Sequence, residues 1–135
     1  SLLFIDVDRL GEVNDQWGFM AGDLVLKNVA QRLRETLRPN DVIGRFGGEE
    51  FVVGLRNCNQ ENAVLVGERL RKRVADSAIK IEEEWIRITV SVGVTTRDRN
   101  LNVLTEKVLE CADQALSRAK QNGRNRVETQ SLSGA

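Results

Sequence analysis

The heptapeptide Arg-Phe-Gly-Gly-Glu-Glu-Phe, residues 45–51, lies between two apolar segments, 42–43 and 52–53, that are rich in β-branched residues. Two strands joined by a two-residue Gly47-Gly48 turn fit this pattern. Glycine lets a backbone approach a ligand closely, and adjacent acids can bind a cation or accept a proton. The segment therefore predicts a β-hairpin with two carboxylates at its tip, although a solvated acidic turn would have the same pattern.

The composition indicates one compact domain. The chain has 135 residues, of which 41% are hydrophobic and 30% charged, which is enough for a single core. Twenty basic and twenty acidic residues cancel, so the chain lacks the basic field of a nonspecific nucleic-acid binder. The absence of histidine excludes His-based metal sites and Ser-His-Asp or Cys-His catalysis. Carboxylates remain as metal ligands, and they favour Mg²⁺ or Mn²⁺ over zinc.

The ends of the chain and its cysteines bear on its cellular setting. No apolar run approaches membrane-spanning length, and no signal peptide opens the chain. Cys58 and Cys111 lack metal-ligand spacing and are typical of free thiols, so we expect a cytoplasmic location. Because a predicted strand begins almost at residue 1, we expect residues 1–130 to be a domain of a larger protein, followed by a short tail, 131–135. A preceding segment could anchor that parent protein to a membrane.

Hydrophobic periodicity predicts the order of the elements. A buried strand at 2–7 is followed by a glycine-containing loop, a first helix with apolar positions from 26 to 37, and the hairpin. A helix at 61–77, an edge hairpin beginning at 79–81, and a buried strand within 86–94 come next. A helix at 103–121 and a short strand at 126–128 complete the chain. This order contains the βαββαβ pattern of ferredoxin-like folds, with an extra C-terminal helix, and predicts an α+β fold with a mostly antiparallel central sheet flanked by helices.

Four acids converge in this arrangement. The strand at 2–7 should lie antiparallel to the second hairpin strand, so that Asp6 faces Glu49 across neighbouring strand ends. Together with Asp8 and Glu50 they repel one another unless a cation lies among them, and a divalent metal is the simplest candidate. Two such cations can align a triphosphate and activate a hydroxyl for in-line attack. Alternatively, Asp8 and Glu50 face solvent or pair with the arginines at positions 9 and 45.

The constellation resembles the GGDEF family of diguanylate cyclases, in its GGEEF spelling. The landmarks agree in order and spacing along nearly the whole chain: Phe4-Ile5-Asp6-Val7-Asp8, Asn14-Asp15, Gly18, Ala21-Gly22-Asp23, the heptapeptide 45–51, Val90-Ser91-Val92-Gly93-Val94, Ala112-Asp113, Ala119-Lys120 and Gly123-Arg124-Asn125.

This resemblance implies a nucleotide-cyclase or palm-like sheet that joins two GTP molecules into cyclic di-GMP and releases two pyrophosphates. It also implies two Mg²⁺ or Mn²⁺ ions in each active site. The family acts as a homodimer in which each copy presents one GTP, and it commonly carries an N-terminal sensor or dimerisation module. No nucleic-acid partner is expected.

The resemblance also assigns roles at the carboxylates. Asp6 and Glu49 would bind metal through their side chains, and Val7 through its main-chain carbonyl. Glu50 would help to deprotonate the attacking 3′-hydroxyl, a role that Glu49 could fill instead.

The same resemblance predicts the substrate contacts. Asn14 and Asp23 match positions that hydrogen-bond guanine, and a carboxylate can accept from the N1–H and 2-amino edge that adenine lacks. Lys120 and Arg124 match phosphate-contacting positions, although cations near a helix C-terminus also complement its dipole. Backbone amides around Leu10 are expected to cradle phosphate oxygens.

A second site is predicted by Arg38-Pro39-Asn40-Asp41, which fits the Arg-x-x-Asp motif of the family's product-binding inhibitory site. Arg69 matches an arginine that assists there, although a solvated helix face would look the same. Product bound at this motif would slow GTP turnover at the distant cleft by allosteric coupling.

Several positions depart from the family pattern. Arg9-Leu10-Gly11 stands where His-Phe-Lys is usual, Phe19 replaces a histidine, and Ser117 replaces a common tyrosine. The lost lysine favours an alternative reading, in which a weakly active or inactive domain serves as a cyclic di-GMP receptor. A different nucleotide cyclase or a palm-type polymerase is a third possibility, but neither would need the guanine contacts.

Overall fold

The computed structural model describes residues 1–97 and 105–132. Its centre is a five-stranded sheet made of β1 (Leu2–Val7), β2 (Val42–Arg45), β3 (Glu50–Gly54), β6 (Val90–Thr95) and β7 (Val127–Thr129). The order across the sheet is β2-β3-β1-β6-β7, and only β6 and β7 pair in parallel. The sheet confirms the predicted α+β, ferredoxin-like class, with β1 antiparallel to the second hairpin strand.

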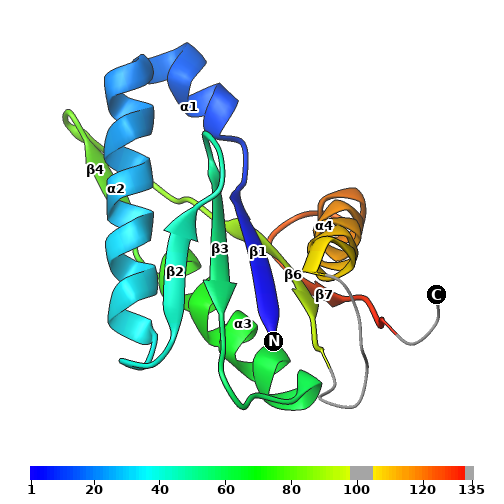
Figure 1. The fold of residues 1–135 in the computed structure, drawn as a ribbon. Helices are drawn as coiled ribbons and strands as arrows, with labels where there is room; N and C mark the ends of the chain where they lie inside the picture. Colours follow the sequence, from blue (N-terminus) through cyan, green and yellow to red (C-terminus); the bar gives the residue numbers. More distant parts are fainter. Residues whose placement is uncertain (98–104, 133–135) are drawn as a thin grey trace.

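Helices cover both faces of this sheet (Figure 1). Alternate residues of β1 show the division, because Leu3 and Ile5 belong to the main core, whereas Phe4 packs with Ala112 and Leu116 on the opposite face. The main-core face is covered by α2 (Phe19–Thr36) and α3 (Gln60–Ala75), and the other face by α4 (Thr105–Gln121). A short helix, α1 (Leu10–Trp17), packs on α2 beyond the end of β1.

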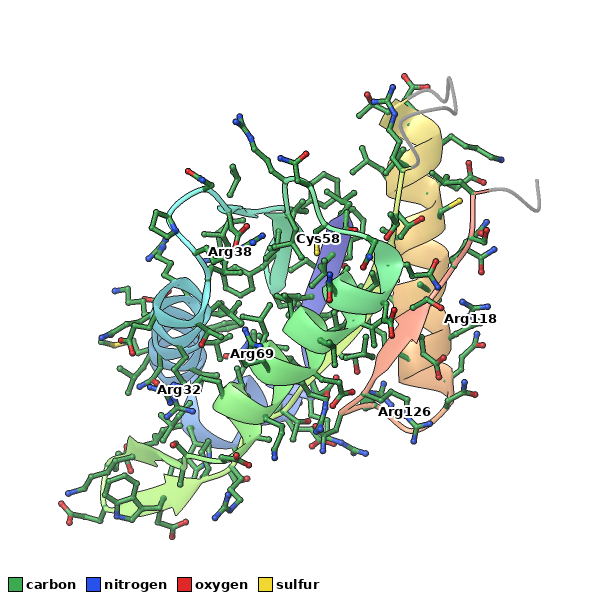
Figure 2. The ribbon with its side chains drawn as sticks, turned by 90° about the horizontal axis from the view of Figure 1, so that it is seen from below. Arg32, Arg38, Cys58, Arg69, Arg118 and Arg126 are labelled. Atoms are coloured by element: carbon green, nitrogen blue, oxygen red, sulfur yellow. The ribbon has the colours of Figure 1, made fainter. Side chains whose placement is uncertain are left out.

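Two smaller features complete the fold. The predicted edge hairpin is present as β4 (Ile79–Ile81) and β5 (Glu84–Ile86), which form their own two-stranded sheet. Arg32 is a buried cation on α2 whose guanidinium donates to the carbonyls of Val74 and Ser77 at 3.0 and 2.8 Å, which joins α2 to the end of α3 (Figure 2). Over the described ranges, no helix combines the length and the apolar character that crossing a membrane requires.

The first loop was predicted wrongly. The glycine-containing segment between the first strand and residue 26 is almost entirely helical, as α1 and the start of α2. Gly18 separates the two helices with a φ of 92°, whereas Gly11 lies within α1. Glycine lowers helix propensity, but packing against α2 overrides that preference here.

The C-terminal third follows the prediction in outline. Residues 103 and 104 of the predicted last helix lie outside the described residues, and the described part begins at Thr105. The predicted last strand lies one residue later than expected, as β7. Within the segment expected to be a tail, Leu132 is buried against Val108 and Cys111, and residues 133–135 lie outside the described part.

Candidate active site

The hairpin tip is held beside the end of β1 by backbone hydrogen bonds. Glu50 lies opposite Asp6 in the register of β1 and β3, and the amide of Val7 donates to the carbonyl of Glu49 at 3.2 Å. The predicted two-residue turn is wrong, because the amide of Phe46 donates to the carbonyl of Glu50 at 2.9 Å and leaves three residues, 47–49, in the turn. This wider turn brings Glu49 as well as Glu50 to the end of β1.

The three acids at this edge all sit in an environment that disfavours their charge. Asp6 is only 3% exposed, and Glu49 and Glu50 are half-buried. Burial raises the pKa of all three, and the charge of Asp6 raises the pKa of each glutamate further. A cation placed among them would relieve both effects.

One such cation comes from the protein itself. The ammonium of Lys120, in the last turn of α4, forms an ion pair with Asp6. Burial acts to lower the pKa of Lys120, but Asp6 and the two glutamates outweigh it, so the pKa is raised. Arg124 follows α4 in a left-handed conformation with a φ of 64°, and its charge acts to lower the pKa of Asp6. Both predicted phosphate-contacting cations therefore lie at the carboxylate edge.

Asp8 lies beside this edge and is held in place by hydrogen bonds. It is 5% exposed and accepts hydrogen bonds from the hydroxyls of Thr89 and Ser91 at 2.6 and 2.7 Å, and from the amide of Asn125 at 3.0 Å. The alternative for Asp8, a solvent-facing side chain or a surface pair with an arginine, is wrong because the side chain is buried. The charge of Asp8 acts to raise the pKa of Asp6, and its carboxylate links the end of β1 to β6 and to the loop that carries Arg124.

A pocket of about 660 Å³ extends from this acidic edge towards α1 and α2. Its most telling side chain is Asn14, whose Oδ1 atom is buried and has no hydrogen-bond partner among the described residues. Asn14 lies directly over Gly22, where an added Cβ would come within 1.8 Å of that oxygen. Buried polar atoms are nearly always paired, so this oxygen can accept a hydrogen bond from a ligand or a water in the pocket. The pocket is lined by Leu10, Asn14, Phe19, Gly22, Asp23, Leu26, Phe46, Gly47, Gly48, Glu49 and Glu50.

The remaining predicted substrate contacts lie around this pocket. Asp23 shares the lining with Asn14, and its exposed carboxylate pairs with Lys27 at 3.2 Å. Arg9 has a left-handed backbone, with a φ of 57°, and precedes α1 without a side-chain cap. Leu10 is the first residue of that helix. Uncapped amides at a helix N-terminus are suited to binding phosphate oxygens.

The predicted second site lies at the opposite end of α2. Arg38 and Asp41 bind each other, because the amide of Arg38 donates to Oδ2 of Asp41 at 2.8 Å and the guanidinium reaches both carboxylate oxygens at 3.3 and 3.2 Å. Arg69 is exposed on α3, which packs against α2 (Figure 2). Within residues 1–97 and 105–132, no hydrogen bond or ion pair joins Arg69 to this pair.

The acidic edge has the donors that a hard cation prefers. Asp6 and Glu49 supply carboxylates, and Val7 is the adjacent main-chain position. The described part of the chain contains no cluster of three or more His, Cys, Asp or Glu side chains placed to hold a metal. A site at this edge would therefore rest on two carboxylates and a backbone carbonyl, and a bound cation would offset the cost that burial places on the charge of these acids.

Sequence reasoning missed two groups near the pocket. Thr89 and Ser91 hold Asp8, and a polar Ser91 within the buried segment 90–94 was a signal that could have been used. Phe46 of the heptapeptide stacks on Phe4 with ring centroids 5.2 Å apart, which fixes one wall of the pocket. No sequence spacing predicts this contact, because it depends on the register of β1 and β3.

Fold and site together define an α+β domain whose central hairpin presents two glutamates beside a buried aspartate. The sequence profile described as "Diguanylate cyclase, GGDEF domain" matches residues 1–126. The chain therefore belongs to the GGDEF family, as the sequence resemblance indicated.

Individual relatives support the same family membership. Diguanylate cyclase A of Treponema denticola is 42% identical over 127 residues, which cover 94% of this chain and 34% of that protein. The GGDEF domain of DgcB from Caulobacter crescentus, solved in complex with c-di-GMP, is 32% identical with a TM-score of 0.89, over 95% of this chain and 75% of that one. The active GGEEF domain of a diguanylate cyclase from Vibrio cholerae is 32% identical with a TM-score of 0.85, and the match covers 96% of this chain and 81% of that one. The chain thus spans about a third of the first curated relative it matches.

Proposed function

We propose that this domain, residues 1–130, condenses two GTP molecules into cyclic di-GMP and two pyrophosphates. Each 3′-hydroxyl oxygen forms a bond to the α-phosphorus of the other GTP, and each bond from that phosphorus to pyrophosphate breaks. The observation that carries the proposal is the pocket itself, which is lined by Asn14, with its unpaired buried oxygen, and by Glu49 and Glu50, the two glutamates beside Asp6. Family membership supports the same reading.

The acidic edge would hold the metal ions. Asp6, Glu49 and the carbonyl of Val7 are the proposed ligands of two Mg²⁺ or Mn²⁺ ions, which when bound neutralise charge on the phosphates. Glu50 lies opposite Asp6 and is proposed to accept the proton of the 3′-hydroxyl. Burial raises the pKa of Glu50, which makes it a stronger base than an exposed glutamate.

The other contacts would place the nucleotide. Asn14 Oδ1 and the Asp23 carboxylate accept from the N1–H and 2-amino groups of guanine, and adenine has no matching donors. Phosphate oxygens bind the amides at Leu10 and the side chains of Lys120 and Arg124. Lys120 would then exchange part of its contact with Asp6 for a contact with phosphate.

One pocket holds one GTP, so a two-fold symmetric product requires two domains that face each other. Purified protein with GTP and Mg²⁺ should give cyclic di-GMP, detected by chromatography, and the yield per domain should rise with protein concentration.

Glu49→Gln removes one metal-binding charge at nearly constant shape and should lower turnover at least about 10³-fold. Glu61→Gln, on the exposed start of α3, is the matched control and should be fully active. Full activity in Glu49→Gln or in Asp6→Ala would contradict the metal assignment.

A receptor for cyclic di-GMP is the second candidate. It is supported by the Arg38–Asp41 pair, which is already formed, and by Gly11 in place of the family lysine. In this reading calorimetry detects cyclic di-GMP binding while the turnover assay detects no product. If the domain turns over GTP efficiently, the same pair is the proposed inhibitory site, with Arg69 assisting, and the receptor reading fails. A sensor or dimerisation module elsewhere in the parent protein is proposed for either role.

A further inference from the structure

Phe19 is an exposed aromatic residue that the proposed contacts leave unused. It is the first residue of α2, and 83% of its surface is exposed. No aromatic ring contact involves Phe19 among the residues that the structure describes. Single exposed apolar residues are common on protein surfaces, so it is the place of Phe19 in the lining of the pocket that points to a role.

Phe19 lies on the same side of α2 as Asp23, one of the two proposed guanine contacts. It precedes Gly22 by three residues and Asp23 by four, and residues at these spacings are neighbours on a helix surface. All three line the 660 Å³ pocket with Asn14, whereas the next residue, Met20, does not, although it is 89% exposed. The helix thus directs one of two adjacent apolar side chains to the pocket.

The pocket has a buried aliphatic side and an exposed aromatic rim. Leu10 and Leu26 line it and are 5% and 7% exposed, in contrast to Phe19. A purine whose edge reaches Asn14 would have its flat faces free for contact with such groups. Phe46, the other aromatic residue of the pocket, is already stacked on Phe4, so Phe19 is the ring available for a base.

We propose that Phe19 stacks on the base of the bound nucleotide and so contributes affinity, while Asn14 and Asp23 contribute the choice of guanine. This inference rests on the proposed function and assigns a further positioning role within that pocket. A base–aromatic stack tolerates any base, because every base has a π-face. Removal of the ring should therefore weaken different purine nucleotides by the same factor.

The test uses 3′-deoxy-GTP and 3′-deoxyinosine triphosphate, which lack the attacking hydroxyl and can be titrated with Mg²⁺ without turnover. Inosine keeps the N1–H donor of guanine but lacks the 2-amino group. Phe19→Ala should weaken binding of both nucleotides about tenfold and leave their affinity ratio unchanged. Phe19→Tyr should retain wild-type affinity, and Met20→Ala, an equally exposed neighbour outside the pocket, should bind normally. Because the side chain is exposed, all three variants should keep the wild-type circular dichroism spectrum.

Each other outcome has a definite meaning. Wild-type affinity in Phe19→Ala, together with lost affinity in Asn14→Ala, would overturn stacking and leave the proposed pocket intact. Equal weakening by Met20→Ala would overturn it as well, because the effect would then belong to the start of α2 in general. A changed ratio between the two nucleotides would indicate an edge contact in place of a stack. If the wild-type protein binds neither nucleotide, the proposed function itself fails.

Discussion

The start and the end of α2 carry the two predicted sites, and they differ in how far their polar groups are already satisfied. At the start, Asn14 beside Gly22 has a buried oxygen without a partner, and the nearby acids have raised pKa values. At the end, Arg38 and Asp41 bind each other through three hydrogen bonds. A helix of 18 residues separates the two regions by roughly 27 Å at 1.5 Å per residue.

This difference separates a site that needs a ligand from one that is stable without it. At the first end, a ligand supplies partners that the protein lacks, so binding removes a cost already present in the folded state. At the second end, a ligand must bind groups that already have partners. Its binding free energy is then only the difference between the new contacts and the Arg38–Asp41 contacts that they replace. Loss of the first site should therefore have a larger effect than loss of the second.

Among changes at the two ends of α2, the largest effect on affinity is expected from Gly22→Ala. The new Cβ would lie 1.8 Å from Oδ1 and 2.8 Å from Cγ of Asn14, so the amide must leave its position. Affinity for 3′-deoxy-GTP should fall about 100-fold, because a hydrogen-bonded contact and its geometry are both lost. Gly11→Ala is the control, since no atom lies within 4 Å of its added Cβ, and it should bind normally. Equal affinities in the two variants would show that Asn14 does not contact the base.

Asp8→Ala tests how the first region is supported. The substitution leaves the hydroxyls of Thr89 and Ser91 and the amide of Asn125 without their acceptor. The free energy of unfolding should fall by ~2–3 kcal/mol, measured by urea denaturation, because buried donors without acceptors are costly. Asp15→Ala, on the exposed face of α1, should change it by less than about 0.5 kcal/mol. A similar loss in both variants would contradict a supporting role for Asp8.

The sequence predicted the parts of this region that depend on topology. Once 2–7 was placed beside the second hairpin strand, Asp6 had to meet the turn, and the register confirms this. The role of Asp8 was missed although Ser91 left a signal, because its partners are 81, 83 and 117 residues away and depend on the positions of β6 and of the loop after α4. The first loop was misassigned because its glycines were taken as breakers, whereas only Gly18 has a backbone conformation that interrupts a helix. Three-dimensional packing decided each of these cases.

Arg38→Ala addresses the second region. Affinity for cyclic di-GMP should fall about tenfold, since a charged hydrogen-bonding group is lost, and initial turnover of GTP should be unchanged. Arg34→Ala, which removes an exposed arginine from the last turn of α2, is the matched control. Asp41→Ala is a poorer test, because Asp41 also accepts from the amide of Arg38 and holds the turn. Unchanged cyclic di-GMP affinity in Arg38→Ala would remove the second site.

The smallest effect is expected from Lys27→Ala, which sharpens the contrast at the start of α2. Lys27 pairs with Asp23 on the surface, and exposed pairs contribute only ~0.2–1 kcal/mol. A ligand that needs the Asp23 carboxylate must compete with this pair, so removal of Lys27 should raise affinity for 3′-deoxy-GTP by about twofold. Raised salt should reduce this gain in affinity, because salt already screens the Lys27–Asp23 pair that the substitution removes. Lys72→Ala, on the exposed surface of α3, should bind like the wild type. A loss of affinity in Lys27→Ala would mean that Lys27 itself attracts the triphosphate. The ion pair of Lys27 with Asp23 would then hold a ligand-binding cation at the start of α2 and would not compete with the ligand.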